Sequence, residues 1–527
     1  MLQSFRVPGF SRRVFLGTAA AAAGASLLPA DGYPAKTRYV RYNATSPQGK
    51  AMLASYAVGI EKLLKLPPQD ARNWFRTAFT HVLDCPHGNW WFLVWHRGFL
   101  GYFEQTVREL SGNPDFAFPY WDWTANPTMP AEMFQGVLNP TNAAFGEYSE
   151  NFTVFTDKLK PHIATYYNWF NEARKEQMRR RDMQTVDSLW TQIAGNPTDG
   201  GWFATRANAR YMTAQNPTLD AETRKAVSWD TVKSALLETS FYDFNSSVTA
   251  NHQIPPPNRQ VFSILEGQPH NLTHNYIGGY LYVPNVDLGW MTNNLSPVDP
   301  VFFLHHSNMD RLWDVWTRRQ QLLKLPFEPD LHDRQKFNDE AFLFYVNNQG
   351  VTLNSIAGEF MNMSRWGYSY EPGSGEELTR PTALVAARRQ RPTFAGTMSN
   401  GAGKVALPSN VAAAGNLIVS LTIPHPMTAG APREYDVLVN APAGTTTGGA
   451  SSPYYVATIS FFGFMAGMQM NDVTFKVPLA QLPPGARGKN PGDLTFTVVP
   501  AVRTKGLLTA TARGAAAVLK DVTVTAQ

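Results

Sequence analysis

The sequence predicts a mainly α-helical N-terminal domain followed by an all-β, sandwich-like C-terminal domain. All 14 tryptophans and ten of the 11 histidines lie in the first 366 residues, which read mostly as helices joined by long loops. After Trp366 tryptophan disappears, and the chain becomes rich in Ala, Thr, Val, Gly and Pro. Short apolar runs separated by turn residues are typical there of a β-sandwich.

The first 30 residues are predicted to form an export signal. An arginine pair, Arg12-Arg13, precedes an Ala-rich apolar stretch that is too short to span a bilayer but has the length of a signal-peptide hydrophobic region. The pair resembles the twin-arginine motif, so a periplasmic or extracellular protein is expected. The alternative, a buried or frayed N-terminal helix, is disfavoured because a charged segment before an alanine run is hard to bury.

The helical domain is expected over residues 31–372, a polar linker over 373–390 and the β-rich domain over 391–527. Residues 171–195 are predicted to form one exposed helix, on which Arg179 to Arg181 are a solvated face rather than a binding patch. In the β-rich domain, apolar and polar residues alternate as in half-buried strands. Six strands are predicted there, over Leu417–Ile423, Tyr435–Val439, Tyr454–Phe462, Val473–Leu479, Leu494–Val499 and Val518–Val524.

Composition excludes several classes of protein. With 43% apolar and 17% charged residues, the chain of 527 residues is an ordinary globular one. The net charge is +5, but three arginines lie in the first 30 residues, which hold no acid, so the remainder carries only +2. This balance argues against a nucleic-acid or polybasic membrane surface. No later apolar run reaches the length of a membrane span, and a single cysteine, Cys85, excludes an intrachain disulfide.

Seven of the 11 histidines fall in two short windows, His81, His87 and His96 in the first and His270, His274, His305 and His306 in the second. The spacing of four between His270 and His274 puts both rings on one helix face, where they can bind the same ion. His306 and Asp310 repeat this spacing, so the carboxylate is predicted to orient the His306 ring. One histidine alone is more often a packed or surface residue, but two such groups indicate metal sites.

All-imidazole coordination favours copper or zinc, because iron usually adds a carboxylate and acids near these histidines are few. Three ligands per ion leave an open position for dioxygen or a substrate. A structural zinc site would instead be closed by a fourth protein ligand, and the windows offer no obvious candidate. The pattern therefore indicates two open sites for copper or zinc, and neutral imidazoles would accommodate both oxidation states of a redox-active copper pair.

Five motifs follow one another along the helical domain: Cys85-Pro86-His87, Trp95-His96-Arg97, Phe118 to Trp123, Pro269-His270-Asn271 with His274, and Asp299 to Trp313. Together they resemble the tyrosinase and polyphenol oxidase family of coupled binuclear copper proteins, which includes molluscan haemocyanins. The triplet Tyr368-Ser369-Tyr370 resembles the motif that closes the catalytic domain of the plant-type enzymes, and the β-rich segment resembles their C-terminal domain. The resemblance implies a four-helix bundle that holds two copper ions, copper A and copper B, with dioxygen as co-substrate.

The resemblance also implies a ligand set for copper B. His270, His274 and His306 would hold this ion, with His305 as a neighbour that faces away. Periodicity alone does not choose between His305 and His306; the family pattern favours His306.

For copper A, the resemblance implies His87 and His96 as the second and third ligands. The first ligand is less direct, because most relatives place it many residues before the second, whereas His81 lies only six residues before His87. No histidine precedes His81, so His162 or His252 would otherwise have to serve. Because copper A needs three imidazole ligands, elimination favours His81 as the first of them.

Cys85 lies where many relatives carry a cysteine bonded to the second copper A histidine. The resemblance therefore implies a thioether between Cys85 and His87, which would fix the ring and remove an oxidisable thiol. The alternative is an unmodified buried cysteine.

Glu266 and Asn271 match a glutamate and an asparagine that are thought to hold a water in the family. Such a water would remove the proton of a bound monophenol, because this reaction needs a base within reach. The alternative is that Glu266 caps or pairs with nearby backbone. Asn293 stands where plant enzymes have a bulky phenylalanine, thirteen residues before the last copper B histidine. The resemblance therefore implies both monophenolase and diphenolase activity.

The β-rich domain is expected to cover the copper entrance, as in latent relatives. The apolar run Phe461 to Met470 is the candidate for a loop that blocks the site, although an ordinary strand and bend of the sandwich is the favoured explanation of this run. Met465, Met468 and Met470 in this run could pass Cu(I) to the site, but clustered methionines usually just pack.

The leading function is oxidation of small phenols to o-quinones by dioxygen. A catechol oxidase or an o-aminophenol oxidase without monophenolase activity is the nearest rival. A haemocyanin-like dioxygen carrier would use the same ligands, and a dizinc hydrolase is disfavoured because such sites normally bridge their metals with a carboxylate.

Overall fold

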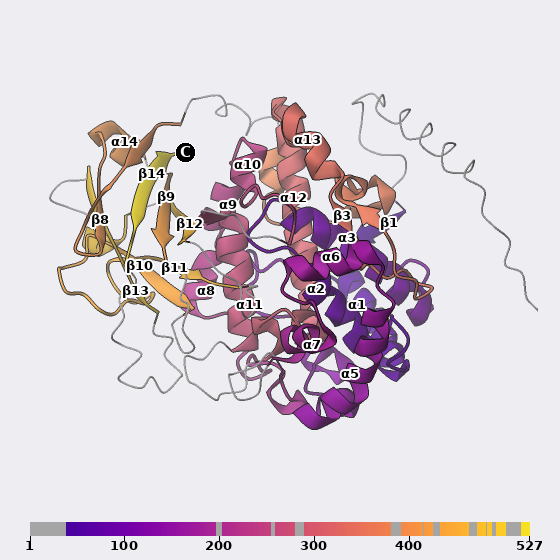
Figure 1. Ribbon diagram of the computed structural model, residues 1–527. Helices are drawn as coiled ribbons and strands as arrows, with labels where there is room; N and C mark the ends of the chain where they lie inside the picture. Colours follow the sequence, from indigo (N-terminus) through magenta and orange to yellow (C-terminus); the bar gives the residue numbers. More distant parts are fainter. Residues whose placement is uncertain are drawn as a thin grey trace, which may run out of the picture. The chain divides into compact units, whose positions relative to one another are not determined.

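The fold is described from a computed structural model of the protein (Figure 1). It describes residues 38–195, 203–253, 259–279, 289–380, 391–414, 416–424, 433–462, 472–480, 482–486, 492–501 and 518–527. The predicted export signal lies outside these ranges, as do Met465, Met468 and Met470. Of the predicted blocking loop, only Phe461 and Phe462 are described.

Two helices near the start of the chain carry the first histidine window. α2 (Trp74–Asp84) begins at Asn73, whose side chain caps the helix by accepting from the N–H groups of Phe75 and Arg76. α3 (Phe92–Ser111) ends at Gly112, which adopts the left-handed conformation (φ 75°) that terminates many helices. Every residue of α2 is buried, so this helix lies inside the helical region and not on its surface.

Two further helices carry the second histidine window. α11 (Asn271–Gly278) continues from one π-helical turn, Glu266–His270, that contains Pro269. α12 (Val301–Leu323) contacts α3, and all of its residues from Val301 to Trp316 are buried. The other described α-helices are α1 (Pro47–Lys65), α4 (Gly146–Ser149), α5 (Phe152–Asn168), α6 (Glu172–Arg180), α7 (Val186–Ala194), α8 (Ala221–Ala226), α9 (Trp229–Leu236), α10 (Phe241–Phe244), α13 (Leu331–Asn338) and α14 (Ser409–Ala414).

The prediction of one exposed helix over residues 171–195 is wrong. The chain forms two helices here, α6 and α7, and Asp182 between them adopts a positive φ of 56°. Arg179 is solvated and pairs with acids of its own helix, but Arg181 is buried. Arg181 therefore differs from Arg179 in its burial, and its contacts lie at the metal site.

The C-terminal region is rich in β-sheet, as predicted, and all six expected strands are present with ends shifted by at most three residues. Two five-stranded sheets have the orders β11-β10-β13-β8-β7 and β2-β12-β9-β14-β6. Their strands are β2 (Arg259–Phe262), β6 (Thr393–Ala395), β7 (Thr397–Ser399), β8 (Ala402–Ala406), β9 (Leu417–Ile423), β10 (Glu434–Val439), β11 (Tyr455–Ser460), β12 (Asp472–Leu479), β13 (Asp493–Pro500) and β14 (Asp521–Ala526).

One strand of the second sheet comes from the helical region. β2 pairs in parallel with β12, in the register Arg259 with Asp472 through Phe262 with Phe475. The rings of Phe262 and Phe475 stack at 5.4 Å between centroids. Because β2 leads directly into the turn that carries Glu266 and His270, the sheet and the second histidine window are joined through the backbone.

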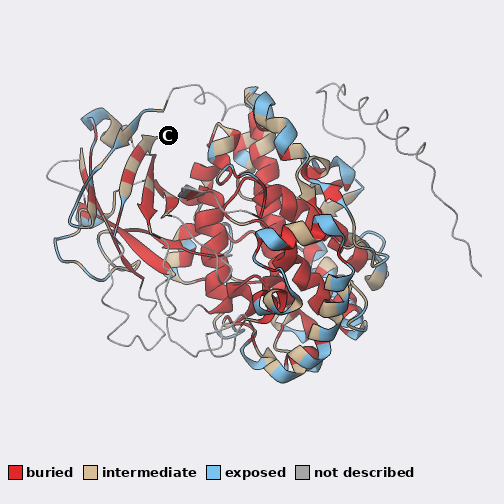
Figure 2. Ribbon diagram, in the orientation of Figure 1, coloured by how far each residue is buried: buried red, intermediate tan, exposed pale blue. Residues whose placement is uncertain are grey.

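Two smaller pairings complete the sheet structure. β1 (Tyr39–Arg41) pairs in parallel with β5 (Tyr368–Tyr370), and β3 (Ala341–Phe342) pairs with β4 (Ser355–Ile356) in antiparallel fashion. Figure 2 shows that the central helices and the inner strands are buried along most of their length. Of the described helices, none is both long and apolar enough to cross a membrane.

Candidate dinuclear metal site

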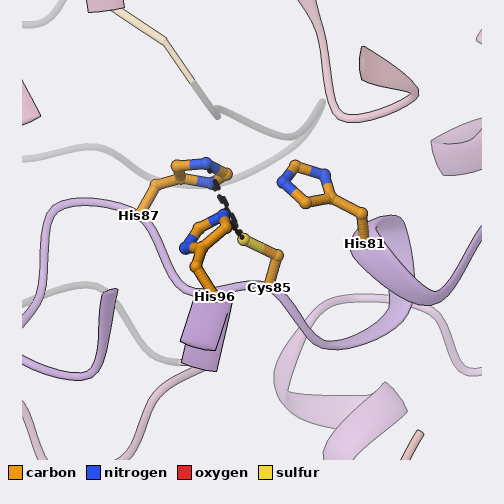
Figure 3. Close-up of side chains that lie close together, drawn as sticks. All are labelled: His81, Cys85, His87 and His96. Carbon is orange, nitrogen blue, oxygen red and sulfur yellow. Dashed lines mark hydrogen bonds between the residues drawn. The ribbon is translucent and has the colours of Figure 1, made fainter. Parts of the chain in front are cut away.

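The single cysteine and the three histidines of the first window form one group, the first cluster: His81, Cys85, His87 and His96. His81 lies in the last turn of α2, His96 lies on α3, and the other two lie on the segment between these helices. One ligand atom from each residue lies within 4.8 Å of the others, and the side chains converge on a common space (Figure 3). The helix pair and its connection thus assemble a group of metal-binding atoms.

Hydrogen bonds at Nδ1 leave Nε2 of His81 and His96 able to bind a metal. Nδ1 of His81 lies 2.8 Å from the carbonyl oxygen of Asn294, and Nδ1 of His96 lies 2.7 Å from that of Phe92. A carbonyl oxygen only accepts, so each Nδ1 carries the proton and each Nε2 presents a lone pair. Nε2 of His81 is buried and has no hydrogen-bond partner among the described residues.

Arg181 supports the connection between the two helices. Its guanidinium donates to the carbonyl oxygens of Cys85 at 2.8 Å and Val82 at 3.3 Å. Both carbonyls lie at the end of α2, where helix carbonyls lack partners within the helix. The expectation that Arg181 belongs to a solvated face is therefore wrong, because this side chain fixes the backbone that carries the first cluster.

The thiol of Cys85 lies inside the first cluster. Its Sγ is 3.4 Å from Nε2 of His96, and 3.7 and 3.9 Å from Nε2 and Nδ1 of His87. Burial raises the pKa of this thiol well above its ordinary value, so it is protonated in the metal-free protein. The sulfur lies beside the His87 ring at non-bonded distance, and the thioether stays a prediction.

The second cluster consists of His270, His274, His305 and His306, again with ligand atoms within 4.8 Å of one another. Nδ1 of His270 lies 2.8 Å from the side-chain oxygen of Asn271, and Nδ1 of His274 lies 2.9 Å from the carbonyl oxygen of Met291. These acceptors again place the proton on Nδ1 and leave a lone pair on Nε2. Nε2 of His274 lies 3.1 Å from Nε2 of His306, a spacing suited to two ligands of one ion.

His305 does not face away from the second cluster, which corrects the expectation. The His305 ring belongs to the group, with its centroid 5.0 Å from that of His274, but its Nδ1 accepts a hydrogen bond of 3.2 Å from the indole N–H of Trp123. A neutral imidazole whose Nδ1 accepts must carry its proton on Nε2, and a protonated nitrogen does not bind a metal. His305 therefore carries its proton on Nε2, and His306 is the better ligand.

The two clusters face each other. The rings of His96 and His306 stack with centroids 4.0 Å apart and an interplanar angle of 7°, and those of His87 and His270 lie 5.8 Å apart. Each of these pairs joins one histidine from each cluster. The protein thus places two groups of imidazoles next to each other in its interior.

Burial keeps these imidazoles neutral. It lowers the pKa of His81 and of His270 to about 3, because a charged ring would lose its hydration. Burial, followed by repulsion between neighbouring imidazoles, also lowers the pKa of His87, His96 and His306 well below the ordinary value. Neutral rings keep the lone pairs that metal binding needs at physiological pH.

The alternative first ligands of copper A are engaged elsewhere. His162 lies on α5, where its ring is 3.5 Å from the side chain of Gln69. His252 is buried between two acids, with Nε2 2.9 Å from Asp84 and Nδ1 2.6 Å from Glu340. Burial alone would lower the pKa of His252, but the two carboxylates raise it above its ordinary value. A doubly protonated ring has no lone pair for a metal.

Residues 58–319 match the model of the common central domain of tyrosinase. The chain belongs to the tyrosinase and polyphenol oxidase family. It is 23% identical over 318 residues to a tyrosinase of Hahella sp., covering 59% of this chain and 51% of the relative. It is 24% identical over 337 residues to the chloroplastic polyphenol oxidase of Spinacia oleracea, covering 60% and 45%. The chain thus spans about half the length of these curated relatives.

Solved structures of the family share the fold. Latent aurone synthase, a polyphenol oxidase, superposes with a TM-score of 0.54 at 18% identity, covering 94% of this chain and 89% of that structure. Latent apple tyrosinase superposes with a TM-score of 0.51 at 16% identity, covering 94% and 98%. Because this coverage includes the β-rich region, the order of a helical region before a β-rich one is shared with both structures.

The two clusters fit the dicopper centre of the tyrosinase family. The fit rests on the orphaned, buried Nε2 atoms of His81 and His270 and on the acceptors that hold four Nδ1 protons. In metal sites the second nitrogen of a ligating histidine is held in this way, which sets both the tautomer and the ring direction. Nitrogen-only donor sets suit copper.

Glu266 lies next to the site and is fully buried. Its two oxygens accept from the backbone N–H of Gly88 at 2.7 Å and from the hydroxyl of Ser246 at 2.5 Å. Burial raises the pKa of this carboxyl to about 8, although both hydrogen bonds oppose the rise. Gly88 follows His87 directly, so Glu266 joins the second histidine window to the loop of the first. This is the capping role that the sequence left open beside the role in holding a water.

Asn271 lies beside the second cluster, and Asn293 lies two residues after Met291, whose carbonyl oxygen lies near His274. Asn271 accepts a hydrogen bond from His270. It donates, at 2.8 Å, to the carbonyl oxygen of Ser460, which belongs to the β-rich region. Asn293 is buried, and its side-chain oxygen accepts from the backbone N–H of Leu295 at 2.7 Å. Sequence reasoning found both asparagines but not Ser460, because nothing in a strand end far along the chain signals such a contact.

Asp310 does not orient the His306 ring, which corrects another expectation. Its carboxylate accepts from Arg97 at 2.6 Å, from Arg41 at 3.2 Å and from the hydroxyls of Tyr368 and Tyr370 at 2.5 Å each. Burial alone would raise the pKa of Asp310, but the two guanidinium groups lower it below its ordinary value. These four donors occupy the carboxylate. Asp310, four residues after His306, therefore belongs to a structural ion cluster and does not support the His306 ring.

One aromatic side chain from the β-rich region lies against both clusters. The ring of Phe462 is 2% exposed. Its centroid lies 4.2 Å from that of His274, 5.3 Å from that of His270 and 5.1 Å from that of His87. Phe462 therefore covers histidines of the first and the second cluster at once.

Proposed function

We propose that this protein is a copper-dependent phenol oxidase that uses dioxygen to hydroxylate monophenols at the ortho position and to oxidise o-diphenols to o-quinones. The observation that carries the proposal is the pair of facing imidazole clusters, in which acceptors at Nδ1 leave a lone pair on Nε2 of His81, His96, His270 and His274. Two bound copper ions would bind dioxygen and pass electrons to it from the substrate. Oxidation of two o-diphenols, each losing two electrons and two protons, reduces one dioxygen to two waters.

The proposed ligands of copper A are His81, His87 and His96, and those of copper B are His270, His274 and His306. His81, His96, His270 and His274 are supported by their Nδ1 acceptors, and His306 is supported by its contact with His274. His305 is left out because the Trp123 indole fixes the wrong tautomer. The matching stretches of the family motif support the same set.

Monophenol hydroxylation is the finer part of the proposal. It needs a base near the substrate hydroxyl, and Glu266 is the buried carboxyl beside the site. In the metal-free protein burial raises its pKa to about 8, so the carboxyl is mostly protonated at neutral pH and becomes a base in mildly alkaline solution. Asn293 in place of a bulky phenylalanine supports access for a monophenol.

One observation favours the rival, a catechol or o-aminophenol oxidase without monophenolase activity. The polar atoms of Glu266 and Asn271 already have protein partners, namely Gly88, Ser246, His270 and Ser460. A water held by these two residues would have to share those partners. The two functions differ in one measurable rate, that of monophenol hydroxylation.

Latency is the second part of the proposal. Phe462 lies over three of the proposed copper ligands, where a phenol would have to approach. The latent aurone synthase and latent apple tyrosinase structures have the same order of helical and β-rich regions. We infer that this chain is likewise held in a low-activity state by its β-rich region.

The deciding experiment is copper reconstitution of the metal-free protein, followed by assays with a monophenol, an o-diphenol and an o-aminophenol. The proposal expects two coppers per chain and oxygen uptake with both phenols. Oxygen uptake with the o-diphenol alone would support the rival. Fewer than two coppers per chain, or no oxygen uptake with any substrate, would refute a phenol oxidase.

The twin-arginine segment supports a proposal of export. Fusion of residues 1–30 to a reporter protein should direct the reporter out of the bacterial cytoplasm, and replacing Arg12 and Arg13 by lysines should stop this export. Export that survives the double substitution would contradict a twin-arginine signal.

A further inference from the structure

The end of β11 presents three consecutive side chains to two different environments. Phe461 packs into the core of the β-rich region, with its ring 5.0 Å from that of Phe475. The side chains of Ser460 and Phe462, one residue to either side, contact the helical region instead. This alternation follows from the two-residue period of an extended chain. One strand end therefore delivers both a polar and an aromatic contact to the second cluster.

Ser460 contacts two residues of α11. Its carbonyl oxygen accepts from the Asn271 side chain at 2.8 Å, and its hydroxyl accepts from the Asn275 side chain at 2.6 Å. Glu434 lies directly opposite Ser460 on β10. One oxygen of Glu434 lies 3.3 Å from the Asn275 amide nitrogen and 3.3 Å from the Ser460 hydroxyl. Glu434, Ser460 and both asparagines have no exposed surface.

Both asparagines lie directly after a histidine of the second cluster. Asn271 follows His270 directly, and Asn275 follows His274 directly. The asparagines are four residues apart, so they share one face of the helix, one turn from each other. The sheet edge thus holds α11 at both turns that carry a histidine of the second cluster, and Asn271 in turn accepts from Nδ1 of His270.

We propose that Glu434 and Ser460 are positioning residues for His270 and His274. The β-rich region is then part of the scaffold of copper B and not only a cover over it. The contacts that carry this role are fully buried, come from adjacent strands in register, and end on the residues next to two ligands. The inference concerns copper binding and so does not depend on which phenol the protein oxidises.

The full-length chain offers matched variants for the test. Ser460→Ala removes the hydroxyl that Asn275 contacts and keeps the strand, and Ser460→Thr restores a hydroxyl. Asn275→Ala breaks the same contact from the helix side and leaves the sheet unaltered. The control is Thr458→Ala: Thr458 is two residues earlier on β11 and opposite Asp436, and its hydroxyl bonds to Asp436 and Tyr455 within the β-rich region.

Copper binding by the metal-free chain is measured by titration against a chelator of known affinity. Removing a group that supports a metal-ligating histidine typically weakens binding 10- to 100-fold. Ser460→Ala and Asn275→Ala should therefore weaken one of the two coppers about tenfold or more, with wild-type affinity kept for the other. Ser460→Thr should recover most of the loss, and Thr458→Ala should bind both ions as the wild type does.

Amide hydrogen exchange of the metal-free protein gives a second readout, which also covers a variant that folds poorly. Exchange of residues 271–278 should be faster in Ser460→Ala and Asn275→Ala than in the wild type and in Thr458→Ala. Wild-type affinity for both coppers in Ser460→Ala and Asn275→Ala would overturn the proposal. So would an equal loss in Thr458→Ala, because the effect would then be general destabilisation of the sheet edge. A protein that binds copper as expected but oxidises no phenol would count against the proposed function alone.

Discussion

Replacing Phe462 by alanine should activate the enzyme. The Phe462 ring contacts His87, His270 and His274, and it is almost completely buried against them. A substrate that approaches these histidines must displace the ring. The free energy of displacing it is therefore subtracted from the free energy of substrate binding.

The size of the effect follows from the burial of the ring. Full burial of a phenylalanine side chain stabilises by about 1.5–3 kcal/mol. Taking about 2 kcal/mol as the preference for the closed arrangement, roughly one molecule in 30 is open, since about 1.4 kcal/mol corresponds to a factor of ten. Apparent affinity falls by this fraction, so F462A should raise kcat/KM for an o-diphenol about 30-fold.

Steady-state quinone formation with copper-saturated protein measures this change. The matched control is F461A, because Phe461 is the same residue type one position earlier but packs against Phe475 in the β core. F461A should lose stability, with a cost of about 3–5 kcal/mol typical of a buried phenylalanine, and gain no activity. A copper-saturated F462A protein with the kcat/KM of the wild type would refute the blocking role of Phe462.

Three further predictions concern the site itself. If Cys85 is bonded to His87, the intact mass of the chain isolated with copper is two hydrogens below the sequence value and no thiol reacts after unfolding; a reactive thiol at full mass would contradict the bond. Because the folded-state pKa of Glu266, about 8, lies above its ordinary 4.5, its stabilising contribution is complete below pH 4.5 and is lost as the pH rises through 8. The free energy of unfolding of metal-free E266Q, relative to that of the metal-free wild type, should therefore increase between pH 4.5 and pH 8 in denaturant titrations. A difference that does not change with pH would show that Glu266 is ionised over this whole pH range. Finally, metal analysis of H306A should find about one tightly bound copper per chain and that of H305F about two, and the reverse result would exchange the roles of the two histidines.

The fold was predictable to the extent that local pattern determines it. The strand at residues 417–423 has the bounds expected from its apolar residues, since alternation and turn residues act over short distances. The break between α6 and α7 was not predicted; Arg181 at this break donates to the backbone of Cys85, a contact between residues far apart in the sequence. The addition of β2 to the second sheet has the same origin: a four-residue segment in the helical region carries no local sign of a distant partner.

The histidines of the site were predictable because metal binding restricts both residue type and spacing. The hydrogen-bond acceptors of these histidines were not predictable, because most are backbone carbonyl groups, which every residue carries. Asn294 and Met291 hold two rings through their main-chain carbonyl groups, so the type of side chain at these positions does not reveal the contact. Asp310 shows the converse: its spacing from His306 is that of a supporting carboxylate, yet its carboxylate accepts from two arginines.

The contacts of β11 limit how the site can open. Ser460 and Phe462 are two residues apart on one strand end, so a movement of the whole strand that withdraws the Phe462 ring also withdraws Ser460 from Asn271 and Asn275. Such a movement would admit substrate and at the same time release the helix that carries His270 and His274. Rotation of the Phe462 side chain alone uncovers the histidines and leaves the Ser460 contacts in place. Activation that keeps copper B bound is therefore a local displacement of one ring, and loss of the entire β-rich region would remove the cover together with part of the metal site.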